Sequence, residues 1–299
     1  MRILVTGSTG LIGSALIPLL RAGGHEIVRL VRAQTRPQSG EIQWDPAAGK
    51  LDASALEGFD GVVHLSGENI GEGRWTAARK QRIFDSRIKS TQLLSESLAQ
   101  LRQPPRVLVG ASAIGYYGDR GDELLREGSS PGSGFLADLC RNWEAACEPA
   151  AEKGIRVVNL RNGVVLSGRG GALPRMVLPF RFFAGGKVGA GKQFLSWIAL
   201  DDTVALILHA LSTDALQGPV NAVGPNPVSN LEFTRILGRV LRRPTVFPVP
   251  AFIIRLAFGQ MGEELLLASQ RVEPARLMTT GFAFRYPQLE GALRHALGK

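Results

Sequence analysis

The sequence predicts an α/β fold in which a doubly wound parallel sheet is joined to a smaller, mostly helical carboxyl-terminal lobe. Strand-like and helix-like segments alternate up to about residue 165, as a parallel sheet with helical crossovers requires. Regularly spaced glycines follow the first strand-like run, at the place where such sheets bind nucleotides. Beyond Ser167 the alternation stops, because glycines and prolines crowd residues 168–192.

The first unit of the chain predicts a dinucleotide phosphate site. Gly7, Gly10 and Gly13 lie between a strand-like run and a helix-like stretch. In a Rossmann-type sheet the first glycine permits a tight turn, the second admits the pyrophosphate, and the third lets the helix pack on the strand. The helix amino terminus adds unpaired N–H donors and the positive end of the helix dipole. The residues expected to hold the cofactor here are Gly7, Thr9, Gly10, Leu11, Ile12 and Gly13.

The second strand-like run indicates which dinucleotide binds. It covers residues 26–31 and ends about twenty residues past the last motif glycine, where NAD sites usually carry Asp or Glu. Arg32 follows it instead, with Arg36 nearby and no acid before Glu41. A guanidinium offers forked donors and a permanent charge to a ribose 2′-phosphate. The sequence therefore favours NADP over NAD, the alternative being a solvated basic loop.

The other segments of the first half continue the alternation. One strand runs into Ser-Gly-Glu-Asn at residues 66–69, which are expected at the carboxyl edge of the sheet, facing the cofactor. Pro104 and Pro105 end a long basic helix before the next strand. The predicted strands cover residues 41–44, 60–65, 107–111 and 156–160. The predicted helices cover residues 53–56, 76–101 and 136–151.

The second half is expected to close over the carboxyl edge of the sheet. One more helix is predicted near residues 203–211 and one more strand near 219–223, followed by helical segments that prolines interrupt. Residues 1–166, with the later strand, would form the NADP-binding Rossmann domain. Residues 167–299 would form the substrate-binding lobe.

A second glycine-rich string, at residues 186–192, matches the GxxxxGK pattern of triphosphate-binding loops. Gln193 stands where Ser or Thr would bind magnesium, no clear strand precedes the string, and no clear helix follows it. We therefore expect a glycine loop near the substrate entrance rather than a triphosphate site.

Composition argues against several classes of function. The net charge of +9 comes mostly from arginine, but the basic residues are spread out and no nucleic-acid-binding signature is present. A positive field that gathers an anionic cofactor accounts for the charge, so no nucleic-acid partner is expected. Four histidines and two cysteines, Cys140 and Cys147, form no ligand cluster, so no metal site is expected.

The distribution of apolar residues predicts a cytoplasmic protein without a membrane partner. The sequence shows neither a secretory leader nor an apolar run of bilayer length. An apolar stripe through residues 252–267 is expected to be buried against the domain, although a membrane or a partner protein is the alternative.

Strings along nearly the whole chain carry a resemblance to a known family. They include Leu-Ser-Gly-Glu-Asn-Ile at 65–70, Ser-Ala-Ile-Gly-Tyr-Tyr-Gly at 112–118, Arg-Asn-Gly-Val-Val-Leu at 161–166 and Ser-Trp-Ile at 196–198. The chain resembles an atypical extended short-chain dehydrogenase/reductase, of the "epimerase family protein" group. This group is NAD-dependent epimerase/dehydratase-like and has a distinctive carboxyl-terminal domain.

The resemblance implies NADP(H) on the glycine loop, with Arg32 at the 2′-phosphate. It places residues 65–67 beside the adenosine side of the cofactor, and the backbone of 163–165 near the nicotinamide. Arg82 or Arg87 on the long helix would reach the cofactor, unless both belong to a solvated helix face. The cofactor-binding residues that this adds are Leu65, Ser66, Gly67, Glu68, Arg82, Arg87, Gly163 and Val165.

The chain departs from the family at the acid/base pair. Short-chain dehydrogenases carry Tyr-x-x-x-Lys on the helix after the 107–111 strand, where lysine lowers the pKa of the tyrosine that exchanges a proton. The matching stretch here, residues 135–144, contains neither residue type at either register. Asp138 or Cys140 of that helix could protrude towards the substrate, the alternatives being an early-helix charge and a packed thiol. The candidate catalytic residues on the preceding loop are Ser112, Tyr116 and Tyr117, although Ser112 falls one place before the usual serine register.

Two functions follow from these observations. The first is an NADP(H)-dependent oxidoreductase or epimerase-like enzyme that acts on a small polar, possibly nucleotide-linked, substrate. The alternative is an NADP-binding sensor or interaction protein with a degenerate active site. Extended members of the family often pair through their long helices, so analogy predicts a homodimer.

Overall fold

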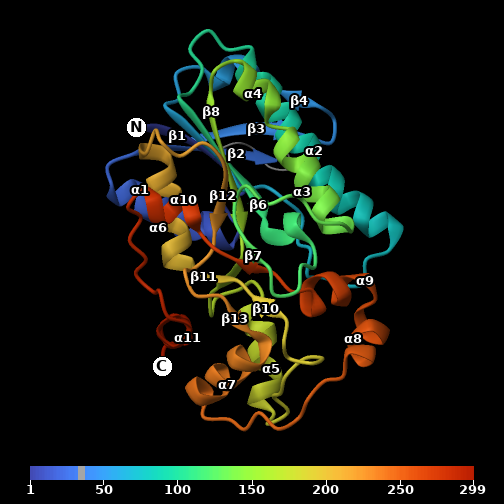
Figure 1. Cartoon of the computed structure of the whole chain (residues 1–299). Helices are drawn as coiled ribbons and strands as arrows, with labels where there is room; N and C mark the ends of the chain where they lie inside the picture. Colours follow the sequence, from blue (N-terminus) through green and yellow to red (C-terminus); the bar gives the residue numbers. More distant parts are fainter. Residues whose placement is uncertain (33–37) are drawn as a thin grey trace.

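The protein is described by a computed structural model that covers residues 1–32 and 38–299, and the predicted fold class is confirmed. A central sheet lies between two layers of helices, and a smaller lobe lies at one end of it (Figure 1). Its strands are parallel except for the last, which forms an antiparallel edge. In spatial order they are β12 (Gly218–Ala222), β8 (Arg156–Asn162), β6 (Val107–Ala113), β5 (Gly61–His64), β1 (Arg2–Thr6), β2 (Glu26–Arg32), β3 (Glu41–Asp45) and β4 (Lys50–Leu51).

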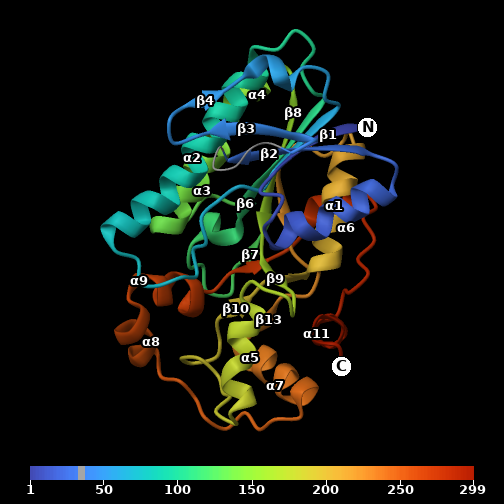
Figure 2. The ribbon, with the colours of Figure 1, turned by 180° about the vertical axis from the view of Figure 1, so that it is seen from behind.

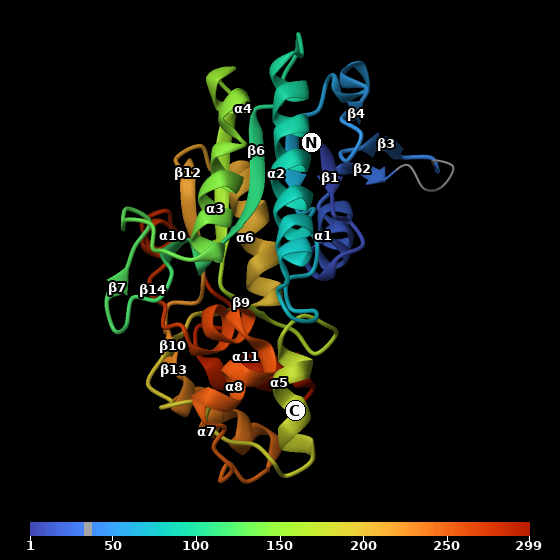
Figure 3. The same cartoon turned by 90° about the vertical axis from the view of Figure 1, so that its right-hand side faces the viewer.

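The alternation of side chains along β1 explains why both faces of the sheet are covered. Ile3 and Val5 point into a core shared with α1 and α6, whereas Leu4 points into the opposite core. In Figure 3, α2, α3 and α4 stand on the near side of the sheet, with α6 behind it. The helices of the two layers are α1 (Leu11–Ala22), α6 (Leu200–Ser212), α2 (Ala77–Ala99), α3 (Phe135–Ala145) and α4 (Glu148–Glu152), with the 3-10 turn η1 (Ala53–Leu56) beside α2.

The smaller lobe has a core of its own. Trp197, Phe180 and Phe233 are buried in it, together with apolar residues of the carboxyl-terminal helix. Its helices and turns are α5 (Leu173–Arg181), α7 (Asn230–Leu241), α8 (Ala251–Phe258), α9 (Gln260–Gly262), η3 (Glu263–Leu267) and α11 (Leu289–Leu297). Its strands are β9 (Val164–Leu166), β11 (Trp197–Ala199), β10 (Phe194–Leu195) and β13 (Val228–Ser229).

The chain crosses between the two parts more often than a boundary at residue 166 implies. The helix and strand expected near 203–211 and 219–223 are α6 and β12, and both belong to the core of the sheet. The helix α10 (Ala275–Thr279) contributes Leu277 to the same core. Two short strands, β7 (Leu124–Leu125) and β14 (Arg271–Val272), pair beside it.

The helix predicted over residues 136–151 is two helices in the structure. α3 ends before Cys147, and α4 restarts with Pro149 in its first turn, where proline is tolerated but cannot continue the preceding ladder. Within the described residues, no helix combines the length and the apolar character needed to cross a bilayer.

A buried histidine links the strands at the centre of the sheet to the helices above them. His64 Nδ1 lies 2.8 Å from Thr6 Oγ1, and its Nε2 lies 2.9 Å from Thr91 Oγ1, which also accepts a hydrogen bond from Trp143 Nε1. Desolvation by burial lowers the pKa of His64 to about 4. The neutral imidazole is therefore the form that the native fold selects.

We predict that acid destabilises the fold through His64. Its native pKa lies below the unfolded value, so its stabilising contribution is complete above pH 6.5 and is lost as the pH falls towards 4. The loss amounts to about 3 kcal/mol of unfolding free energy at pH 4. Urea unfolding at several pH values, compared with a His64→Asn variant that cannot titrate, measures it. Parallel pH profiles of the two proteins would contradict this prediction.

Candidate functional site

The glycine loop is formed where two backbone segments come into close contact. A Cβ added to Gly7, whose φ is +64°, would lie 2.6 Å from the carbonyl carbon of Leu65, at the end of β5. A Cβ on Gly13 would lie 2.3 Å from the oxygen of Gly7. Neither position accepts a side chain, because real Cβ contacts of this length do not occur. The first and third motif glycines are thus required by the fold itself.

The middle glycine is less crowded than the other two. A Cβ on Gly10 would meet only the oxygen of Gly7, at 3.3 Å, and both Thr9 and Gly10 are exposed. α1 starts at Leu11 without a side-chain cap, so the N–H groups of its first turn have no partner within the helix. Free donors, a positive helix end and the absence of a side chain fit a pyrophosphate at this point.

Arg32 is the last residue of β2, at the same edge of the sheet as the glycine loop. Its side chain is exposed, and among the described residues its guanidinium has no hydrogen-bond or ion-pair partner. An exposed guanidinium at this position is available to bind a phosphate group. Arg36, which the sequence places nearby, lies outside the described residues.

Arg87, on α2, contacts the loop that follows β5 and holds its backbone in place. Its Nη2 donates to the Glu68 carbonyl oxygen at 2.9 Å, its guanidinium lies 4.9 Å from the centre of the Trp143 ring, and a Cβ on Gly67 would lie 3.1 Å from its Cζ. Desolvation lowers the pKa of Arg87 to about 10. Arg87 is 9% exposed and therefore does not belong to a solvated helix face.

The other predicted arginine has a different environment. Arg82 is largely exposed, and its Nε lies 3.6 Å from Oε1 of Glu68, which also pairs with Arg79. The Glu68 carboxylate is thus turned towards α2. Contact of Arg82 and Glu68 with a cofactor stays a prediction.

Ser112 and Tyr117 lie in one buried polar network. The Ser112 hydroxyl donates to Glu144 Oε1 at 2.7 Å, and Arg161 donates to both Glu144 oxygens at 2.8 Å. Arg161 also donates to the Tyr117 hydroxyl at 3.0 Å, which in turn donates to Asn221 at 2.7 Å. Burial alone would lower the pKa of Arg161, but the bonds to Glu144 outweigh it and raise that pKa. Two of the three predicted catalytic hydroxyls, those of Ser112 and Tyr117, are therefore hydrogen-bonded inside the protein.

The environments of the two tyrosines differ. Tyr117 has no exposed surface, and burial raises the pKa of its hydroxyl. Tyr116 is only partly buried, and its ring stacks on the Arg161 guanidinium at 3.4 Å from the ring centre. No described residue hydrogen-bonds the Tyr116 hydroxyl. Of the three predicted catalytic residues, only Tyr116 has a hydroxyl free to meet another molecule.

α3 offers no substitute for the missing acid/base pair. Leu136, Leu139 and Cys140 are all buried, and burial raises the pKa of the Cys140 thiol to about 12. Asp138 points to the exposed side, where it pairs with Arg141 at 2.5 Å. At the place where short-chain dehydrogenases carry the Tyr-Lys pair, α3 thus presents a buried apolar face.

The segment expected near the nicotinamide is held by close backbone contacts. A Cβ on Gly163 would lie 2.6 Å from the Ser196 oxygen, and the Gly163 N–H donates to Ala222 at 3.1 Å. Val165 follows in β9, partly buried against the core that includes α1. Gly163 and Val165 therefore lie just beyond the carboxyl end of β8, and their contact with a cofactor stays a prediction.

Sequence reasoning missed two contacts that shape the site. A Cβ on Gly171 would lie 3.0 Å from Leu11, so the loop carrying the exposed Arg169 passes over the start of α1. The Glu264 carboxylate accepts from the N–H groups of Phe135 and Leu136, at 3.0 and 2.8 Å, and caps α3 from the smaller lobe. Only the glycines beside Arg169 gave a local signal, because Glu264 is 129 residues from its partner.

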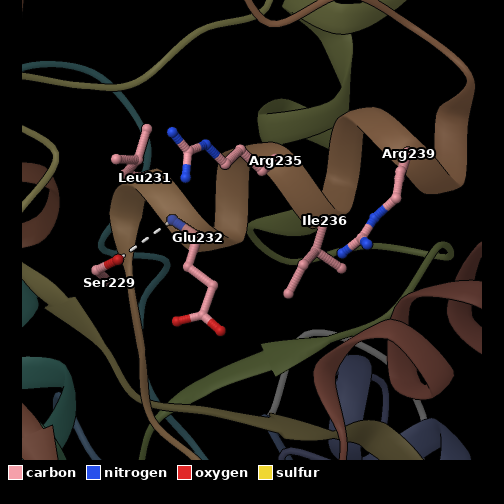
Figure 4. A pocket seen from close by; sticks show the side chains of 6 residues that line it. All are labelled: Ser229, Leu231, Glu232, Arg235, Ile236 and Arg239. Carbon is pink, nitrogen blue, oxygen red and sulfur yellow. Dashed lines mark hydrogen bonds between the residues drawn. The ribbon is translucent and has the colours of Figure 1, made fainter.

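Two open hollows of about 410 Å³ mark the surface. One lies on the outer side of α7, a helix that packs within the smaller lobe, and its lining does not reach the glycine loop (Figure 4). The other lies between the sheet domain and the smaller lobe. The segment that follows β5 forms one of its walls. The residues that line it are Gly71, Glu72, Gly73, Arg74, Arg175, Ala257, Phe258 and Met261.

The string at residues 186–192 is not a triphosphate loop in the structure. It pairs with the segment before α8 through Gly189 N–H to Val249 at 2.8 Å and Val249 N–H to Lys187 at 2.8 Å. A strand, β10, follows it instead of a helix.

Comparison with known proteins places this architecture. The chain is 42% identical to an epimerase family protein of Mycobacterium leprae, covering 98% of the chain and 94% of the relative. It is 37% identical to the human epimerase family protein SDR39U1, covering 98% and 99%. A crystal structure of human SDR39U1 (isoform2) with NADPH aligns at a TM-score of 0.90 with 36% identity, over 100% of both chains.

A solved nucleoside-diphosphate sugar epimerase from Corynebacterium glutamicum is 41% identical, with a TM-score of 0.82, over 100% of this chain and 58% of that one. Residues 249–296 match a domain of unknown function, DUF1731, which spans α8 to α11. Residues 3–224 match the NAD dependent epimerase/dehydratase family. The resemblance that the sequence strings predict is confirmed, and the chain belongs to the NAD-dependent epimerase/dehydratase family.

Proposed function

We propose that the protein is an NADP(H)-dependent oxidoreductase or epimerase-like enzyme for a small polar, possibly nucleotide-linked, substrate. One observation carries the proposal: the uncapped start of α1 and the exposed Arg32 lie at the same edge of the sheet. A pyrophosphate and a 2′-phosphate need these two groups. The NADPH in the crystal structure of the human relative supports the choice of cofactor. A cytoplasmic location and a homodimer stay predictions.

The bound nicotinamide would supply hydride chemistry. The residues of the chain would orient the substrate and exchange a proton with it. Tyr116 is the candidate for proton exchange, because its hydroxyl is free and its ring lies on the Arg161 guanidinium. Ser112 and Tyr117 would act as positioning residues, because their hydrogen bonds hold Glu144 and Arg161 in place.

The alternative is an NADP-binding sensor without turnover. The apolar face of α3 favours it, because neither Leu136 nor Cys140 can exchange a proton near neutral pH. The smaller lobe, which meets the sheet domain at this hollow, favours an enzyme, because a sensor has less need of an enclosed site.

We predict that Arg32→Ala weakens NADPH binding by about tenfold to a hundredfold, the size of one lost charge-assisted interaction. NADH binding should hardly change, because NADH lacks the 2′-phosphate. Calorimetric titration of both nucleotides measures this. Arg21→Ala, at the opposite end of α1, is the control with the same change in charge. Equal losses for NADPH and NADH would contradict the assignment.

We predict opposite effects for two glycines of the loop. Gly10→Ala should keep the thermal stability but lose most nucleotide binding, because its methyl group enters the space left for the phosphates. Gly13→Ala should lower the unfolding free energy by about 1–3 kcal/mol, because its methyl group would clash with the Gly7 oxygen. Thermal unfolding and nucleotide titration separate the two. A Gly10→Ala protein that binds NADPH normally would contradict the assignment of the glycine loop as the phosphate site.

We predict that the two tyrosines also separate. Tyr117→Phe should lower the unfolding free energy by about 1–3 kcal/mol, because it leaves the buried Asn221 Oδ1 and Arg161 Nη1 without the hydroxyl that they share. Tyr116→Phe should leave stability unchanged and reduce turnover by about a hundredfold or more. NADPH oxidation with a panel of carbonyl compounds gives the activity. Turnover that survives Tyr116→Phe would move the proton transfer elsewhere, and a wild-type protein that binds NADPH but turns over nothing would favour the sensor.

A further inference from the structure

Large apolar side chains are exposed on three stretches of the smaller lobe: the end of α5, the segment before α8, and α8 itself. Six of them, each more than half exposed, define what we call the apolar rim. They are Phe182, Phe183, Val246, Phe247, Phe252 and Leu256. Single exposed apolar residues are ordinary, but a group of this size usually marks a contact surface. The predicted burial of the stripe at residues 252–267 is therefore wrong for its first part.

The three stretches that form the apolar rim are joined to one another. Phe247 N–H donates at 3.2 Å to the oxygen of Gly185, two residues after Phe183, and α8 begins four residues after Phe247. The Arg243 guanidinium lies 4.5 Å from the centre of the Phe183 ring. Figures 1 and 2 show the end of α5 and the connection from α7 to α8 side by side in the smaller lobe.

The backbone at the apolar rim is held in an unfavourable conformation. Phe183 and Arg242, with φ of 59° and 55°, are the only non-glycine residues of the described chain with positive φ. This region costs a residue with a side chain about 1–2 kcal/mol. Such strain persists where surrounding contacts maintain it, and it is commonest at functional surfaces. Here it holds a phenylalanine and an arginine at the surface.

The stretches of the chain that carry the apolar rim are basic. Residues 173–200 and 233–262 contain no Asp or Glu, whereas they contain seven arginines and two lysines. Among the described residues, Arg181 and Arg242 have no side-chain ion-pair partner, and Arg255 pairs with Glu263 beyond the end of the segment. The apolar rim thus lies on a basic part of the smaller lobe, with Arg243 in contact with Phe183. A second copy of the same face would be repelled, whereas a surface of phosphates would be attracted.

We propose that the apolar rim docks on an anionic lipid bilayer. The exposed phenylalanines and Leu256 would enter the boundary between headgroups and acyl chains, and Arg181, Arg242 and Arg243 would pair with lipid phosphates. This contact does not need a membrane-spanning helix. It replaces the expectation that the protein has no membrane partner, and it does not rest on the proposed catalytic function.

Sedimentation with vesicles of phosphatidylcholine and phosphatidylglycerol, mixed 7:3, tests the proposal. We expect the full-length protein to bind these vesicles at least fivefold better than vesicles of phosphatidylcholine alone, and less at high salt. Phe252→Asp combined with Leu256→Asp should reduce the bound fraction at least fivefold. Arg181→Glu combined with Arg242→Glu should do the same.

Met278→Asp is the matched control, because Met278 is 56% exposed on α10, outside the apolar rim. Circular dichroism melting of every variant tests its fold. Equal binding to both kinds of vesicle, or binding that the two double variants leave unchanged, would overturn the proposal. So would an absence of binding, and if sedimentation equilibrium then shows self-association that the Phe252/Leu256 double variant abolishes, the apolar rim joins two copies of the chain instead.

Discussion

The site depends on how closely two backbone segments approach at the centre of the sheet. Gly7 leaves β1 against the first peptide after β5, and Gly13 brings α1 against Gly7, with no room for a Cβ at either position. These contacts place the start of α1 between two strands whose crossovers leave in opposite directions, which is where a parallel sheet opens at its edge. His64, one residue before Leu65, fixes the end of β5 through its hydrogen bonds to Thr6 and Thr91. The phosphate cradle is therefore a result of backbone packing.

The second half of the site is organised by charge. The buried pair of Arg161 and Glu144 joins β8 to α3, and it collects Ser112 and Tyr117 on one side and the Tyr116 ring on the other. An isolated buried charge would be costly, so removal of either partner leaves the other unsatisfied. Residues that resemble catalytic groups in the sequence thus form the support for the few groups that remain accessible.

Local signals predicted most strands of the central sheet. The glycine spacing, the Arg32 position and the strand at 219–223 followed from patterns that act over a few residues. The partners of Ser112 and Tyr117 could not be predicted in this way, because Glu144, Arg161 and Asn221 meet them only across the sheet. The exposure of Phe252 and Leu256 also escaped prediction, since an apolar pattern does not reveal whether a neighbouring element covers it.

The cap that Glu264 places on α3 has a consequence for synthesis of the protein. A ribosome releases α3 long before residue 264 exists, so the first N–H groups of this helix must be hydrated in the nascent chain. The sheet is also incomplete until β12, its edge strand beside β8, has been synthesised. Contacts of such long sequence separation slow folding. The helix that bears the apolar site face therefore reaches its final environment only when almost the whole chain has emerged, and until then chaperones have an uncapped helix and an unpaired strand edge to bind.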